Sequence, residues 1–109
     1  MMKCYHVRIT RHAMEKLRDI QTYIAVRLGS PLTAERQRDR LLDAIGRLSG
    51  SPNRFRVVDF EPEHSRGIRR MNVGRYAVFF VVDDDTVIVL NILHGMMDIQ
   101  RRLQEEKRR

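Results

Sequence analysis

The chain has 109 residues, a length that suits one domain and leaves no room for a second core. Hydrophobic residues make up 42% of it, which is enough for a packed core and excludes an intrinsically disordered protein. The net charge is +7 and arginine outnumbers lysine, so the surface favours an acidic partner, either nucleic acid or an acidic protein.

The composition also bears on compartment and redox chemistry. No apolar run approaches the roughly 20 residues that span a bilayer, and the opening MMKCYHVRIT has no signal-peptide core. We therefore expect a cytoplasmic protein. Cys4 is the only cysteine, so an internal disulfide and a cysteine metal cluster are both excluded. We expect Cys4 to be a small buried or half-buried side chain.

The first half of the chain predicts one strand and two helices. Residues 5–9 alternate apolar and polar side chains, as in a strand with one buried face, and Thr10 is placed to cap the helix after it. Apolar residues then recur at helical spacing as far as Gly29, a residue that suits a helix C-terminus. Ser30 as N-cap and Pro31 in the first turn begin a second helix. So short a link predicts an antiparallel helical hairpin.

The second half predicts strands. Residues 53–67 form a loop, with a short strand expected at Arg56 to Phe60. From Ile68 the chain is extended, and the runs 76–82 and 87–93 are apolar on both faces, as in central strands. The residues between these two runs, Asp83 to Thr86, form a tight turn. Residues 96–109 are expected to form a short C-terminal helix.

These elements predict an α+β fold over residues 1–109, in which the helical hairpin packs on an antiparallel sheet. The second face of the sheet then needs a partner or the final helix to cover it. The expected core is Met14, Leu17, Ile20, Ile24, Leu41, Ile45, Leu48, Val78, Phe80, Val87, Val89 and Ile92.

Candidate functional residues are few. The three aspartates 83–85 lack the other oxygen ligands and the glycine of a calcium loop, so we predict no metal and no cofactor. The basic cluster Arg66, Arg69, Arg70 and Arg75 is either a contact surface for phosphates or carboxylates, or a solvated edge strand. On a continuous strand, Arg69 and Arg75 would point to one face.

His94 ends the last apolar run, immediately before Gly95. Histidine suits proton transfer because its unperturbed pKa lies near neutrality. A lone histidine at a strand end is more often structural. Both interpretations stay open on the residues alone.

The helix AMEKLRDIQTYIAVRLGSP, the segment LLDAIGRLSGSP and the block GIRRMNVGRYAVFFVVDDDTVIVLNILHG resemble the RelE/ParE toxin superfamily over nearly the whole chain. The resemblance implies the same α+β fold and a toxin of a type II toxin–antitoxin, or plasmid stabilisation, system. It also implies a cognate antitoxin as partner. RelE-like members cut messenger RNA on the ribosome, whereas ParE-like members act against DNA gyrase.

Several positions depart from the nuclease branch. Ala77 stands where such a nuclease usually has arginine, Met96 or Met97 where a second basic residue follows the last strand, and Leu103 in place of a C-terminal tyrosine. His94 falls where YoeB-like nucleases have a catalytic histidine, but their following tyrosine is Gly95 here.

The resemblance therefore favours a ParE-like gyrase inhibitor, a binding protein rather than an enzyme. The alternative is a RelE-like ribosome-dependent ribonuclease with His94 as its weak catalytic candidate. A third interpretation is a basic interaction domain without toxicity. Arg69, Arg70 and Arg75 are the candidate contacts for a partner or a phosphate.

Overall fold

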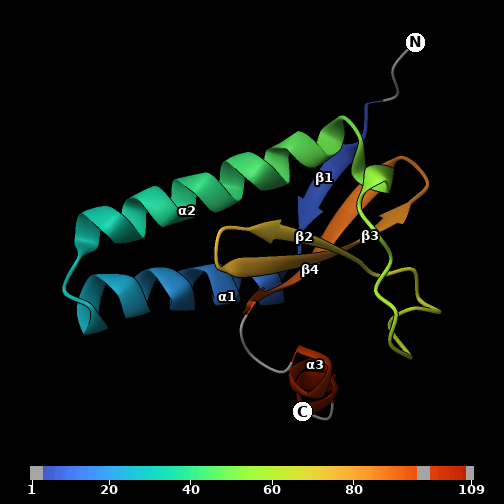
Figure 1. The fold of residues 1–109 in the computed structure, drawn as a ribbon. Coiled ribbons are helices and arrows are strands. Elements are labelled where there is room, and N and C mark those ends of the chain that lie inside the picture. Colours follow the sequence, from blue (N-terminus) through green and yellow to red (C-terminus); the bar gives the residue numbers. More distant parts are fainter. Residues whose placement is uncertain (1–3, 96–98, 108–109) are drawn as a thin grey trace.

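The structure is a computed structural model that describes residues 4–95 and 99–107. The chain forms, in order, β1 (His6–Ile9), α1 (Arg11–Thr22), α2 (Pro31–Gly46), β2 (Arg69–Val73), β3 (Tyr76–Asp83), β4 (Thr86–His94) and α3 (Ile99–Lys107). A π-helical turn, Tyr23–Arg27, extends α1. Figure 1 shows α1 and α2 as an antiparallel hairpin joined at one end of the molecule. The expected α+β fold and order of elements are confirmed.

The four strands form one sheet in the order β1-β4-β3-β2. The pairs β2–β3 and β3–β4 are antiparallel, as expected, but β1 lies parallel to β4. The reason is the connection after β1. A crossover through two helices carries the chain over one face of the sheet to β2. Two successive antiparallel pairings, β2–β3 and β3–β4, then give β4 the same direction as β2 and β1.

Local signals in the sequence set the ends of the helices. The Thr10 hydroxyl accepts a hydrogen bond from the Ala13 N–H at 3.1 Å, which confirms the predicted cap. Gly29 has φ +63°, the left-handed conformation that ends helices. Ser30 does occupy the N-cap of α2, but its hydroxyl bonds to the Thr33 hydroxyl and makes no cap to a backbone N–H.

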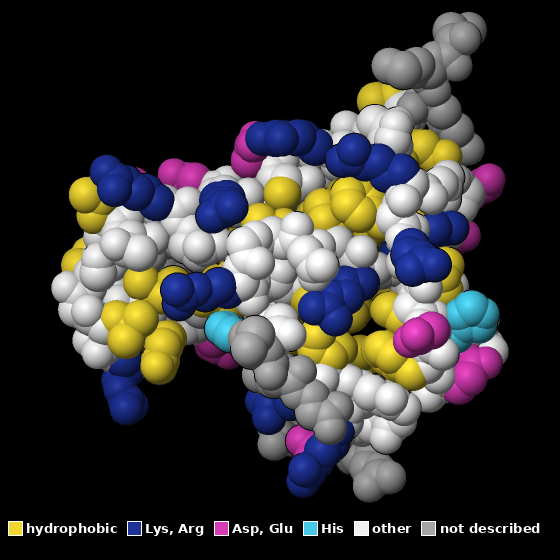
Figure 2. Space-filling view, viewed as in Figure 1, with side chains coloured by type: hydrophobic (Ala, Val, Ile, Leu, Met, Phe, Trp, Pro, Cys, Tyr) yellow, Lys and Arg dark blue, Asp and Glu magenta, His cyan; other side chains and the backbone are white. Residues whose placement is uncertain are grey.

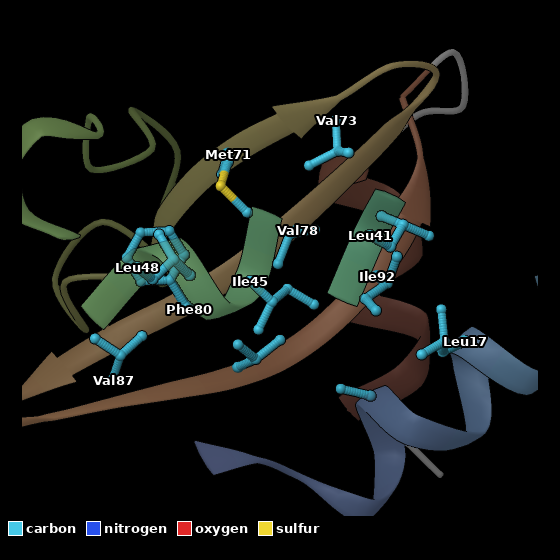
Figure 3. Close-up of a cluster of buried hydrophobic side chains, with 12 residues drawn as sticks. Leu17, Leu41, Ile45, Leu48, Met71, Val73, Val78, Phe80, Val87 and Ile92 are labelled. Carbon is cyan, nitrogen blue, oxygen red and sulfur yellow. The ribbon is translucent and has the colours of Figure 1, made fainter. Parts of the chain in front are cut away.

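The main core lies between the helical hairpin and one face of the sheet (Figure 3). Its side chains come from α1, α2 and alternate positions of β2, β3 and β4. Two residues of the expected core, Met14 and Ile20, are only partly buried and pack against this cluster. The remaining expected residues are buried: Leu17, Ile24, Leu41, Ile45, Leu48, Val78, Phe80, Val87, Val89 and Ile92.

The opposite face of the sheet carries a second apolar cluster. Ala77, Phe79 and Leu93 are covered there by Ile68 from the preceding loop and by Ile99 of α3. The final helix thus covers this face, as the sequence suggested. The short strand expected at Arg56 to Phe60 does not form; a single bridge, Val57 to Arg69, takes its place.

Cys4 is exposed, and the prediction of a buried or half-buried side chain is wrong. The reason is its position. β1 begins only at His6, so Cys4 precedes the strand and no neighbouring strand packs over it.

A β-bulge in β4 changes which side chains face the helices. From Asp83↔Thr86 to Phe80↔Val89 the pairing is regular, but Phe79 pairs with Asn91, so Leu90 is an extra residue. Because one extra residue reverses the alternation of side chains, Ile92 and His94 face the same side as Val87 and Val89. His94 therefore points to the hairpin side of the sheet, opposite Tyr76.

Candidate partner-binding site

His94 and Tyr76 meet at the end of the sheet, where the bulge brings them into register. Their rings pack edge to face, with centroids 5.6 Å apart. The next ladder bond runs from the Gly95 N–H to the Arg75 carbonyl, at 2.7 Å. A Cβ at Gly95 would lie 3.2 Å from that carbonyl oxygen and 3.4 Å from an Arg70 guanidinium nitrogen, so only glycine fits without displacement.

A groove of about 680 Å³ opens between α1 with its π-helical turn and the ends of β3 and β4. Ile20, Ile24 and Ile92 give it apolar walls. Its polar lining is mostly basic or aromatic. It consists of Lys16, Asp19, Tyr23, Arg75, Tyr76, His94 and Arg102.

Exposed hydrophobic side chains extend this groove over the tip of the helical hairpin. Tyr23 and Leu28, which line the groove, are 54% and 60% exposed, and Val26 and Leu32 nearby are 71% and 58% exposed. Figure 2 shows hydrophobic side chains gathered at this end of the molecule, with Lys and Arg side chains around them. Exposed apolar surface of this kind is typical of contact sites for other proteins.

The Tyr76 phenol is half-buried in the groove. Burial raises the pKa of Tyr76, the nearby Arg75 cation lowers it and Tyr23 raises it further, with a net rise. The phenol therefore keeps its proton at neutral pH. It can donate a hydrogen bond, but it is not available as a base.

RNA cleavage by a 2′-hydroxyl needs a base, an acid and a cation for the charge on phosphorus. The groove brings together His94, Tyr76 and Arg75, which include one candidate for each role. At two positions where a nuclease of the resembled family has reactive groups, this chain supplies no further group for catalysis. Ala77 is fully buried in the sheet and Leu103 packs in the second apolar cluster. Met96 and Met97 lie outside the described residues.

The four predicted arginines do not form one surface. Arg75 lies in the two-residue turn between β2 and β3, so it does not share a strand face with Arg69. Arg69 donates hydrogen bonds to the carbonyls of Phe55 and Asn53 and holds the preceding loop in place. The Arg70 guanidinium bonds to the Asn72 side chain, and Arg66 lines a separate cavity beneath α3.

Sequence reasoning missed Lys16, Tyr23, Tyr76 and Arg102 as groove residues. Lys16 and Tyr23 lie on the predicted first helix, and an exposed tyrosine beside an apolar stripe was a usable signal. Tyr76 carried none. Without the bulge at Leu90, the turn at Asp84 would have paired Tyr76 with Leu93 instead of His94.

Glu106 attaches α3 to the rest of the molecule. Its carboxylate lies 2.5 Å from the Lys16 ammonium and 3.3 Å from His12 on α1, and accepts a 2.5 Å hydrogen bond from Asn91 on β4. Burial alone raises the pKa of Glu106, but the hydrogen bonds from Lys16 and Asn91 outweigh it and lower the pKa overall. This attachment places Arg102 beside the groove.

Two further findings concern the described part of the chain alone. No group of three or more His, Cys, Asp or Glu side chains there is arranged to hold a metal ion. None of its helices has the length and apolar character that crossing a membrane requires.

Comparison with known proteins gives a family match. Residues 7–99 match the ParE toxin of type II toxin–antitoxin systems, parDE. Among curated protein sequences none matches. Solved structures also share the fold. A chain of the chromosomal ParDE toxin–antitoxin system of P. aeruginosa superposes with a TM-score of 0.71 at 19% identity, covering 84% of this chain and 96% of that one.

The second structure is the toxin–antitoxin complex RelBE2 of Mycobacterium tuberculosis. It matches with a TM-score of 0.58 at 24% identity and covers 86% of this chain and 94% of that one. At such identities the two likenesses show the shared fold.

Proposed function

Because this chain belongs to the family of ParE toxins of type II toxin–antitoxin systems, we propose that it inhibits DNA gyrase and is neutralised by a cognate antitoxin. The observation that carries the proposal is the family match over residues 7–99. Action on gyrase requires a cytoplasmic protein, so we propose that location as well. Plasmid stabilisation is the biological role that such a pair would serve.

The chemistry of the groove supports binding over catalysis. Its apolar walls, with Lys16, Arg75 and Arg102 beside them, suit a protein segment that has one apolar and one acidic face. Ala77 replaces the arginine that a nuclease of this family usually has on the strand, and Leu103 on α3 replaces the C-terminal tyrosine. The contact of His94 with Tyr76, at the end of the β3–β4 ladder, supports a structural role for His94.

Plasmid topology in cells tests the gyrase proposal. Production of the toxin should relax a reporter plasmid, because blocked gyrase no longer introduces negative supercoils. Topoisomers separated on a chloroquine gel report the change. A plasmid that keeps its superhelical density while growth stops would contradict the proposal.

A second candidate function rests on one observation, the meeting of His94, Tyr76 and Arg75 in the groove. It is the RelE-like alternative, with the ribosome and messenger RNA as partners. Primer extension on messages from a translating extract separates the two candidates. Cuts within the decoding site identify a ribonuclease, whereas intact messages agree with the gyrase proposal.

We place the antitoxin over the groove and the apolar tip of the hairpin, near Arg70 and Arg75. Arg69 is a poor probe of this contact, because it holds the loop through Phe55 and Asn53. The double variant Arg70→Glu/Arg75→Glu should weaken antitoxin binding by about tenfold, and salt should weaken the wild-type complex. Titration calorimetry measures both effects.

The matched control is Arg11→Glu/Arg18→Glu, which changes the net charge equally on the exposed face of α1. It should leave the affinity nearly unchanged. Equal losses in both double variants would show that net charge, and not this surface, governs the binding.

A further inference from the structure

A second hollow surface lies along the outer edge of β2, on the side away from β3. One part, of about 320 Å³, lies between the C-terminal half of α2 and β2, and another, of about 800 Å³, lies between β2 and the loop before it. Both parts are lined by Arg54, Phe55 and Asn72, so they form one continuous channel. We call it the β2 channel.

The β2 channel is lined by several arginines and by the carboxylates of Asp43 and Asp59. Arg40 comes from α2, Arg54 and Arg56 from the loop, and Arg70 from β2 itself. None of these four forms an ion pair with a carboxylate of the described residues. Arg47, which also lines the channel, is paired with Asp43. Outside the channel, ion pairs are formed by Lys16, Arg38, Arg101 and Arg102. Figure 2 shows basic side chains spread over this face, around hydrophobic ones.

Neutral contacts hold these guanidinium groups in place. Arg40 lies against the turn at Gly74, where a Cβ would be 3.3 Å from its nearest nitrogen. Arg54 lies 4.7 Å from the centre of the Phe55 ring, and Arg70 donates a 2.8 Å hydrogen bond to Asn72. Because these contacts leave each charge uncompensated, the N–H donors stay available to an anion.

The backbone edge of β2 is partly occupied already. The Arg70 N–H donates to the Arg56 carbonyl at 3.2 Å, and the Val58 N–H donates to the Ile68 carbonyl at 2.9 Å. An added peptide strand would need these groups. Side chains are therefore the main groups available to bind a ligand in the channel. This favours a ligand that offers negative charges and aromatic rings.

Two half-buried aromatic rings complete the lining, Phe55 and Phe60. Cations that follow a phosphate backbone, interleaved with rings on which bases stack, are the elements that bind single-stranded nucleic acid. We propose that the β2 channel binds single-stranded nucleic acid through Arg40, Arg54, Arg56 and Arg70. Its binding is independent of base sequence. Arg40, Arg54 and Arg56 lie outside the groove, and only Arg70 is shared with the proposed antitoxin contact.

Fluorescence anisotropy tests this proposal with a labelled DNA strand of about 12 nucleotides and its RNA counterpart. That length lies within the range of about 4–16 nucleotides that single-strand binding sites cover. Both strands should bind more tightly than a blunt duplex of equal length. With four arginine contacts, log Kd should change with log salt concentration by a slope of about 3. The variant Arg54→Glu/Arg56→Glu should weaken binding by about tenfold or more and reduce the slope by about 1.4.

The control Arg11→Glu/Arg18→Glu, with the same change in net charge, should bind like the wild type. Circular dichroism checks that both variants are folded. Three results would each overturn the proposal: equal losses in the two variants, a preference for the duplex, or binding of an acidic peptide in the channel while the single strand does not bind. Arg70 also takes part in the proposed antitoxin contact, so this test changes Arg54 and Arg56 instead. Arg54→Glu/Arg56→Glu should leave antitoxin affinity and gyrase inhibition unchanged, so failure of this proposal is distinguishable from failure of the other two.

Discussion

At the scale of single residues, the central question is what His94 does. It packs edge to face against Tyr76 and lies one residue before Gly95, whose N–H closes the β3–β4 ladder on Arg75. These contacts support a structural role for His94 at the end of the sheet. Arg75 and Tyr76 beside it are also what a ribonuclease would use, so a substitution must decide.

The substitution His94→Gln should leave growth inhibition in cells largely intact. One positioned acid or base is typically worth about 10²–10⁴-fold in rate. A loss of toxicity in that range, with messages cut by the wild type and not by the variant, would make His94 catalytic. Tyr76→Phe removes only the hydroxyl and keeps the ring that packs against His94, so it tests the candidate acid without loss of packing.

Among single residues, Glu106 gives the clearest prediction of how folding stability depends on pH. Its pKa is lowered in the folded protein, so its stabilising contribution is complete above the ordinary glutamate range. That contribution is lost as the pH falls below about 4.3, through the folded value. Urea unfolding at about pH 7 and about pH 3.5 should show a larger loss of stability for the wild type than for Glu106→Gln.

At neutral pH, Glu106→Gln should cost about 1–3 kcal/mol, because charged hydrogen bonds to Lys16 and Asn91 are weakened. Glu105→Gln is the matched control, since that carboxylate pairs only with Arg101 among the described residues. Identical pH profiles for the wild type and Glu106→Gln would refute the assigned attachment of α3.

At the scale of elements, Thr10 links the first helix to the bulged strand. Its hydroxyl caps α1 at Ala13 and donates a 3.4 Å hydrogen bond to the carbonyl of Leu90, the extra residue of the bulge. Its own N–H donates to the Val89 carbonyl at 3.0 Å. One residue thus joins the start of the hairpin to the feature that turns His94 toward the groove.

Thr10→Ala should lower the free energy of unfolding by about 1–2 kcal/mol, as expected for a lost N-cap. Thr10→Ser keeps the hydroxyl and should retain most of the stability. Urea unfolding followed by circular dichroism measures both. A cost below about 0.3 kcal/mol for Thr10→Ala would mean that the hydroxyl contributes little to either contact.

The sequence predicted those elements whose signals are local. The cap at Thr10, the glycine at the end of the first helix and the apolar stripes all appear where their spacing indicated. Features that depend on pairing between distant segments were not predictable. The parallel β1–β4 pair and the bulge at Leu90 carry no local signal. The turn that removes Arg75 from its strand depends on the β2–β3 register, in which Val73 pairs with Tyr76.

At the scale of the whole molecule, the surface divides into two contact regions. The groove, with the hydrophobic tip of the hairpin, is apolar with a basic rim. In the β2 channel, four arginines form no ion pair with a described carboxylate, beside the pair Arg47–Asp43 and the carboxylate of Asp59. A net charge of +7 spread in this way favours two acidic partners of different chemistry.

Supercoiling of relaxed plasmid by purified DNA gyrase tests the proposed function most directly. Addition of the purified toxin should stop supercoiling in proportion to its concentration, and His94→Gln should inhibit as well as the wild type. Prior addition of the antitoxin should restore supercoiling. Full gyrase activity at a large excess of folded toxin, together with cut messages in a translating extract, would contradict a gyrase inhibitor and establish the ribonuclease.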